Sequence, residues 1–230
     1  MDFFYLSLVA ALRLIVQFDP DLLLIAWTSI RISLTSALFA ALVGVPLGGT
    51  IAIYQFRGKR ILELLLNSMM ALPTVTIGLI FYGLLTRNGP LGAYGLLYTP
   101  TAIVLGEFVL ILPIIVNLSI SAVHSADPRL LSTLQMLGAK RWQQMVSVLR
   151  EMHRSVMAGV VTGFGRAIGE VGVAMILGGN IQGFTRTMTT AIALETNKGE
   201  FEFALALGML LLTVAFMVNW VLFLLKETRP

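Results

Sequence analysis

Long apolar stretches recur along this chain and constrain its fold more than any other feature. A helix of about 20 apolar residues is needed to cross a hydrocarbon layer of about 30 Å. Charged residues make up only 12% of the chain and hydrophobic residues 57%, a balance that does not suit a water-soluble globule. We therefore predict an all-α, polytopic membrane helix bundle with about five transmembrane helices, at residues 27–52, 64–85, 101–123, 155–177 and 203–225.

A shorter apolar stretch precedes these spans. Residues 3–18 include Arg13 and end at Asp19-Pro20-Asp21, which combines helix-stop with helix-start residues. This stretch fits a helix that lies on the membrane surface better than one that spans it, although both remain open. We predict an N-terminal interfacial amphipathic helix in residues 1–24 and a transmembrane domain in residues 25–226.

The basic residues are distributed unevenly over the predicted loops. If residues 53–63 are cytoplasmic, four Lys and Arg residues lie outside (Arg13, Arg87, Arg186 and Lys198) and ten lie inside (Arg57, Lys59, Arg60, Arg129, Lys140, Arg141, Arg150, Arg154, Lys226 and Arg229). The positive-inside rule then places the N-terminus outside and the C-terminus in the cytoplasm. The net charge of +4 reflects this topology and implies no nucleic-acid partner, because the basic residues do not cluster with aromatic ones.

Several classes of chemistry are excluded by the residues present. The chain has no cysteine, and its two histidines, His124 and His153, flank one predicted loop, so no metal-ligand set is expected. No Gly-rich nucleotide loop, serine elbow or carboxylate pair appears. An enzyme is therefore not predicted, and a partner would supply the energy for uphill transport. An ion-coupled secondary carrier is the alternative, although such carriers usually have more spans and internal repeats.

The predicted cytoplasmic loop, residues 124–154, contains two short helical patterns. Asp127-Pro128 is typical of a helix start, and leucines follow three and four residues apart up to Leu137. Gly138 fits a helix C-terminus, and a second pattern begins at Trp142. The sequence predicts two helices around Gly138 that form a protruding knob, whereas the alternative is a solvated connector.

Further motifs, in this order and spacing, resemble those of molybdate and tungstate importer permeases, which are binding-protein-dependent ABC importers. They are Val43–Gly48, Ala71–Gly78, Asn88–Gly92 and Gly165–Gly172. The family's loop motif is matched at Gly138, Ala139 and Val148, but Ser132-Thr133-Leu134 replace its Glu-Ala-Ala and Arg150-Glu151 replace its Leu-Pro. With Gly178–Ile181, these departures look most like the tungstate-type branch. The resemblance covers nearly the whole chain after Asp21.

This resemblance implies a type I ABC importer permease that passes an oxyanion, tungstate or alternatively molybdate or a similar ion, across a prokaryotic cytoplasmic membrane. It implies a homodimer of permeases, two cytoplasmic ATPase subunits that use ATP and Mg, and an extracytoplasmic oxyanion-binding protein. The chain itself would bind no cofactor. The residues expected to couple it to the ATPase are Leu134, Leu137, Gly138, Ala139, Lys140, Arg141 and Trp142.

Four charged residues fall within the outer half of the predicted spans: Arg31, Glu107, Arg166 and Glu170. Unpaired charge is costly in a membrane, so we predict a buried charge cluster with at least one ion pair, Arg166 with Glu170, which are four residues apart on one helix face. The cluster could lock helices together or change partners when an outer gate opens. Alternatively, the arginines could face the pore as anion ligands.

Hydroxyl and amide groups are the expected lining of the translocation pathway. Thr74 and Thr76 follow Pro73 in the middle of a predicted span, where proline frees backbone groups. Their hydroxyls could donate hydrogen bonds to an oxyanion, or could bond back to their own helix. Asn117 is a further candidate for the pathway or its gate.

Overall fold

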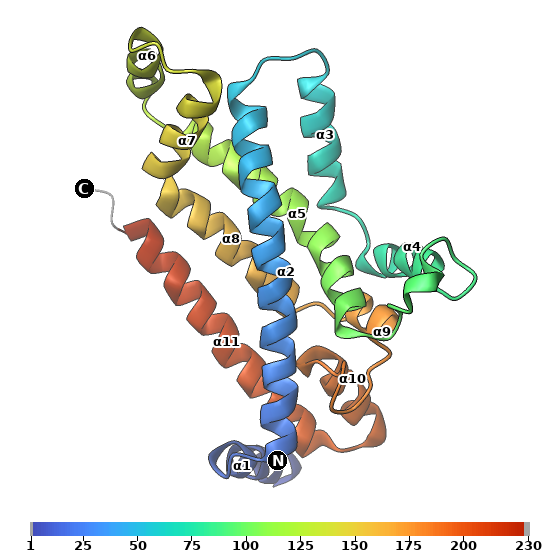
Figure 1. Cartoon of the computed structure of the whole chain (residues 1–230). Helices are drawn as coiled ribbons and strands as arrows, with labels where there is room; N and C mark the ends of the chain where they lie inside the picture. The colour runs from blue at the N-terminus through green and yellow to red at the C-terminus, as the bar shows by residue number, and fades with distance from the viewer. Residues whose placement is uncertain (1, 228–230) are drawn as a thin grey trace. The chain divides into compact units, whose positions relative to one another are not determined.

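The computed structural model of the chain describes residues 2–227, which form helices and connections without a β-strand. Figure 1 shows their arrangement along the chain. The α-helices are α1 (Asp2–Val16), α2 (Pro20–Ile53), α3 (Lys59–Met69), α4 (Thr74–Leu85), α5 (Pro100–His124), α6 (Pro128–Met136), α7 (Arg141–Glu151), α8 (His153–Ile168), α9 (Gly172–Gly178), α10 (Met188–Lys198) and α11 (Phe201–Glu227); a 3-10 turn, η1 (Gly92–Tyr94), follows α4. The predicted all-α class is confirmed.

Three of these helices, α2, α5 and α11, are long and apolar enough to cross a membrane, and up to five spans result if α3 with α4 and α8 with α9 each count as one. The predicted spans at 64–85 and 155–177 are both present as pairs of helices, but each pair is broken and bent, by 99° and 61°. The first breaks at residues 70–73, where Pro73 has no N–H to donate. The second breaks at residues 169–171, where the Glu170 carboxylate accepts a hydrogen bond from the backbone N–H of Val173 in the next helix.

The described residues form two compact units. The first unit contains residues up to 36, residues 73–107 and residues 165–217. Within it, α4 packs against α9, with the backbone of Gly172 close to Thr74 and Gly78 close to Ile176. Glycine at these positions lets the two short helices approach closely. This unit contains all four predicted charged residues and both predicted threonines.

The second unit contains residues 37–72, residues 108–164 and residues 218–227. Its apolar core has buried residues from α2, α5 and α7, with partly buried leucines from α3 and α6 packed against them. Val148 of α7 and Val116 of α5 lie at its centre, 0% and 1% exposed. The predicted knob is therefore anchored in a core shared with two long helices.

One close contact in the second unit leads to a stability prediction. A Cβ atom at Gly48 of α2 would lie 2.6 Å from both the Ser119 Cβ and the Val116 carbonyl oxygen of α5. The backbone oxygen cannot move without disturbing α5. Gly48→Ala is therefore expected to lower the free energy of unfolding by about 1–3 kcal/mol, the usual cost of overpacking, which thermal unfolding of the purified protein would measure.

Gly83→Ala in α4 is the matched control for this substitution. No atom lies within 4 Å of a Cβ built at Gly83, so the added methyl group meets no obstacle. Alanine in place of glycine inside a helix should then stabilise by about 0.5–1 kcal/mol. If both variants shift the melting temperature in the same direction and by the same amount, the close contact between Gly48 and α5 does not determine the effect of the added methyl group.

Candidate functional site

The predicted knob is present as α6, a tight turn and α7. The Asp127 carboxylate caps α6 by accepting a hydrogen bond from Arg129 N at 2.8 Å, with Pro128 at the first helical position. Gly138 adopts φ of +73°, and Ala139 N donates to Leu134 O at 2.9 Å, which satisfies a terminal carbonyl of α6. On the other side of the turn, Gln143 Oε1 accepts from Lys140 N at 2.7 Å. The prediction of two helices around Gly138 is confirmed.

The knob presents large apolar side chains to its surroundings. Met136 is 87% exposed, Leu137 77% and Trp142 57%, and Lys140 and Arg141 beside them are exposed as well. Of these residue types, Trp, Met and Arg are enriched in protein–protein interfaces. Leu134 differs from the other predicted coupling residues, because it packs inward against the core. Leu134 therefore supports the knob from inside, whereas Leu137 and Trp142 are exposed on its surface.

Gln144 was not identified from the sequence, although it braces the same turn. Its side chain is 4% exposed, and its Nε2 donates to Ala139 O at 2.7 Å. It thus holds the residue after Gly138 from inside the knob. Its position four residues before the buried Val148 is the signal that could have placed it on the inward face of α7.

In the first unit, Glu170 lies at the junction between α8, α9 and α10. Its carboxylate is 3% exposed, and its Oε2 accepts a hydrogen bond from Arg166 Nη1 at 2.8 Å. Its Oε1 accepts from Val173 N at 3.2 Å, which caps α9, and its backbone oxygen accepts from Thr189 Oγ1 at 2.7 Å. The predicted ion pair between Arg166 and Glu170 is confirmed, and the same carboxylate also fixes the break between the two helices.

The other predicted charges are not paired in this way. Glu107 of α5 is 1% exposed, and its Oε2 lies 2.9 Å from the Ser36 hydroxyl oxygen of α2. Arg31 is exposed and forms no ion pair with any residue that the structure describes. The prediction that Arg31 belongs to a buried cluster was wrong, because its side chain lies on the outer face of α2. The buried members are the two carboxylates.

A threonine-rich segment beside this junction was missed by the sequence reasoning. Thr185, Thr187, Thr189 and Thr190 are all buried. Thr187 caps α10 by accepting from Thr190 N at 3.4 Å, and Met188 N donates to Ser29 Oγ of α2 at 2.6 Å. The segment thus ties the start of α10 to α2 through hydroxyl groups. Four threonines within six residues were the available signal.

Tyr98 connects the segment before α5 to the end of α9. Its backbone N–H donates to Leu177 O at 2.8 Å, and its ring lies over Gly179, where a Cβ would come within 2.7 Å of Cδ1. Gly179 also has φ of +69°, so a side chain is disfavoured there on both counts. The hydrogen bond with Tyr82 of α4 raises the pKa of the Tyr98 phenol above its ordinary value.

The predicted pathway residues are distributed over both units. Thr74 is the first residue of α4 and is partly buried near α9, whereas Thr76 is exposed. Among the described residues, neither hydroxyl forms the alternative hydrogen bond back to its own helix, whereas Thr28, Thr35 and Thr50 of α2 each form such a bond. Asn117 lies in the second unit, where its Nδ2 donates to Met70 Sδ at 3.2 Å.

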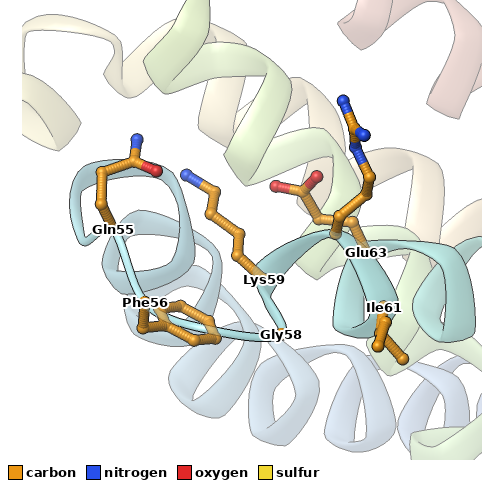
Figure 2. Close-up of a pocket in the computed structure, with 7 residues that line it drawn as sticks. Gln55, Phe56, Gly58, Lys59, Ile61 and Glu63 are labelled. Atoms are coloured by element: carbon orange, nitrogen blue, oxygen red, sulfur yellow. The ribbon is translucent and has the colours of Figure 1, made fainter.

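A pocket of about 490 Å³ lies at the connection between α2 and α3 (Figure 2). It is lined by Gln55, Phe56, Gly58, Lys59, Arg60, Ile61 and Glu63. Lys59 Nζ donates to Ala52 O at 3.1 Å, so its charge complements the C-terminal end of the α2 dipole. Across the part of the chain that the structure describes, no group of three His, Asp or Glu side chains is arranged to hold a metal ion.

Residues 44–227 match the model of a family described as the binding-protein-dependent transport system inner membrane component. The chain belongs to this family. The permease is 40% identical over 218 residues to the tungstate uptake system permease protein TupB of Peptoclostridium acidaminophilum. The aligned region covers 95% of this chain and 96% of that protein.

Two further similarities agree with this assignment. TupB of Campylobacter jejuni is 36% identical over 228 residues, covering 99% of this chain and 95% of that protein. A crystal structure of an amino acid ABC transporter with histidines superposes with a TM-score of 0.66 at 12% identity, covering 94% of this chain and 97% of that one. The permease therefore has the fold of an ABC transporter permease, and its resemblance to the tungstate-type branch is confirmed.

Proposed function

We propose that this permease carries tungstate through the membrane as a subunit of an ATP-driven importer. The observation that carries the proposal is the similarity, at 36% and 40% identity over nearly the whole chain, to two tungstate uptake permeases. Molybdate is the alternative substrate, because it is a tetrahedral dianion of the same shape and charge. An ion-coupled carrier is disfavoured by the family to which the chain belongs.

The knob supports a role in coupling this transport to ATP hydrolysis. Its exposed Leu137 and Trp142 provide an apolar contact surface, and the Gly138 turn holds them in place. Two ATPase subunits, which use ATP and Mg, would dock there on a homodimer of permeases. This arrangement requires the knob and the C-terminus to face the cytoplasm and the N-terminus to lie outside, as the distribution of basic residues predicts.

Weakly polar groups suit the passage of a dianion better than fixed positive charge does, because an ion that binds tightly leaves slowly. Thr74 and Thr76 supply hydroxyl groups at the start of α4, next to a break in the helix. Arg166 is held by Glu170, so its charge is neutralised. In the proposed mechanism, an extracytoplasmic binding protein delivers the oxyanion, and alternating access moves it past these hydroxyl groups.

The proposal is tested by reconstituting the permease with its ATPase and binding protein in liposomes. ATP-dependent uptake of tungstate is expected, with molybdate and sulfate as weaker competitors. Omission of the ATPase should abolish both uptake and ATP turnover, because the chain has no phosphate-binding loop. A preference for molybdate would contradict the proposed substrate. ATP turnover by the permease alone would contradict the proposal that a separate subunit hydrolyses ATP.

A further inference from the structure

The buried carboxyl group of Glu107 has no role in the function proposed above, and its surroundings differ from those of Glu170. Both side chains are buried in the first unit, at 1% and 3% exposed. Glu170 has a guanidinium partner at 2.8 Å, whereas no cation lies within ion-pair distance of Glu107 among the described residues. Its contacts on α2 are the hydroxyl groups of Ser36 and Ser33. A buried carboxylate without a counter-charge is strongly disfavoured.

The number of hydrogen-bond donors around Ser36 also favours a protonated carboxyl group at Glu107. Ser36 Oγ lies 2.9 Å from Ile32 O, one turn earlier in α2, and 2.9 Å from Glu107 Oε2. A serine hydroxyl has a single hydrogen to donate, and a carbonyl oxygen has none. If the hydroxyl donates to Ile32 O, as serines inside helices commonly do, the hydrogen between Ser36 and Glu107 has to come from the carboxyl group.

We propose that Glu107 is a proton-binding site within the membrane-spanning part of the permease, and that its carboxylic acid form donates a hydrogen bond to Ser36 Oγ and thereby fastens α5 to α2. The ligand of the site is a single proton. Loss of that proton would leave a charge in an apolar setting, and the Ser36 hydroxyl could donate to the carboxylate only by giving up its hydrogen bond to Ile32 O. The contact between the two helices would therefore be weakened there.

The neighbouring charges are compatible with this proton. Glu170, at the junction of α8 and α9, is the acidic group whose charge acts on Glu107. The charge of Glu170 is offset by its ion pair with Arg166. On α2, Arg31 is exposed and is not paired with Glu107. Residues of α9, Gly172–Gly178, are all uncharged, and Gly106 beside Glu107 packs directly against Val173 and Leu177 of that helix.

Infrared spectroscopy of the full-length permease in a maltoside detergent tests the proposal, because this detergent has no ester carbonyl that would absorb in the region of a carboxylic acid. At neutral pH, the wild type should show the carbonyl stretching band of a buried, hydrogen-bonded carboxylic acid. Glu107→Gln should remove this band, whereas Glu195→Gln, the matched control, should leave it unchanged, because Glu195 is buried at 7% exposed but is ion-paired with Lys198 at 3.0 Å. Absence of the band from the wild type, or its persistence in Glu107→Gln, would overturn the proposal.

A second variant keeps the test decisive if Glu107→Gln does not fold. Ser36→Ala removes the acceptor of the proposed bond without changing any charge. The band should then remain but shift to higher frequency, as expected for an acid that has lost its hydrogen bond. A band that does not move in Ser36→Ala would show that Ser36 does not accept from Glu107. Neither experiment uses substrate or ATPase, so the outcome is independent of the proposed transport of tungstate.

Discussion

Replacing Gly138 with valine is expected to reduce ATP-driven transport by about tenfold or more while leaving the permease in the membrane. Gly138 has φ of +73°, a conformation that costs an L-residue about 1–2 kcal/mol and a β-branched residue more. The turn would therefore open and displace the exposed Leu137 and Trp142. Each 1.4 kcal/mol lost from docking corresponds to a tenfold weaker contact with the ATPase. Transport and ATP hydrolysis measured in the same liposomes would show the loss.

Gly138→Asn is the matched control, because asparagine tolerates the left-handed conformation. No atom lies within 4 Å of a Cβ built at Gly138, so valine and asparagine are both accommodated sterically and differ in backbone preference. Asparagine should retain most of the transport. If valine transports as well as asparagine does, with the ATPase still bound, the conformation of this turn does not govern coupling.

The second large effect is expected at the pair formed by Arg166 and Glu170. Arg166→Met would leave a carboxylate that is 3% exposed without its cation. Breaking a fully buried pair in this way costs about 3–5 kcal/mol, and the cost should be smaller here because the Arg166 side chain is 42% exposed. Thermal unfolding of the assembled permease should show a clear decrease in the melting temperature.

Combining Arg166→Met with Glu170→Gln should restore part of that stability. Glutamine keeps an oxygen that can accept from Val173 N, and no charge is then left unpaired. The double variant should therefore melt at a higher temperature than Arg166→Met alone. A double variant that is less stable than either single variant, with the two effects simply adding, would show that the two side chains do not interact energetically.

The sequence predicted the helical class and the knob well because their signals are local. Asp127, Pro128 and Gly138 act on the backbone within a few residues, and apolar length alone identifies the spans. The two broken spans were harder to predict. At the second break, the Glu170 side chain accepts from Val173 N and its backbone oxygen accepts from Thr189 of α10, and this last contact depends on a segment 19 residues away. Apolar periodicity contains no information about such contacts.

The candidate site was predicted in part for the same reason. Arg166 and Glu170 are four residues apart on one helix, so their pairing could be read from spacing. The exposure of Arg31 could not be predicted in this way, because the depth of a residue in the membrane does not indicate which face of its helix it occupies. The role of Ser36 opposite Glu107 links residues 71 positions apart. Contacts of this kind follow from tertiary packing and leave no mark on the local sequence.

The division of the knob into an inward and an outward face allows its specificity to be changed separately from its fold. Its inward leucines and Val148 belong to the core of the second unit, whereas Met136, Leu137 and Trp142 contact little of the chain itself. Exchanging these three outward residues should leave the scaffold intact. Under the coupling role proposed above, grafting these few side chains from another importer would change which ATPase docks on the knob without repacking the core beneath it.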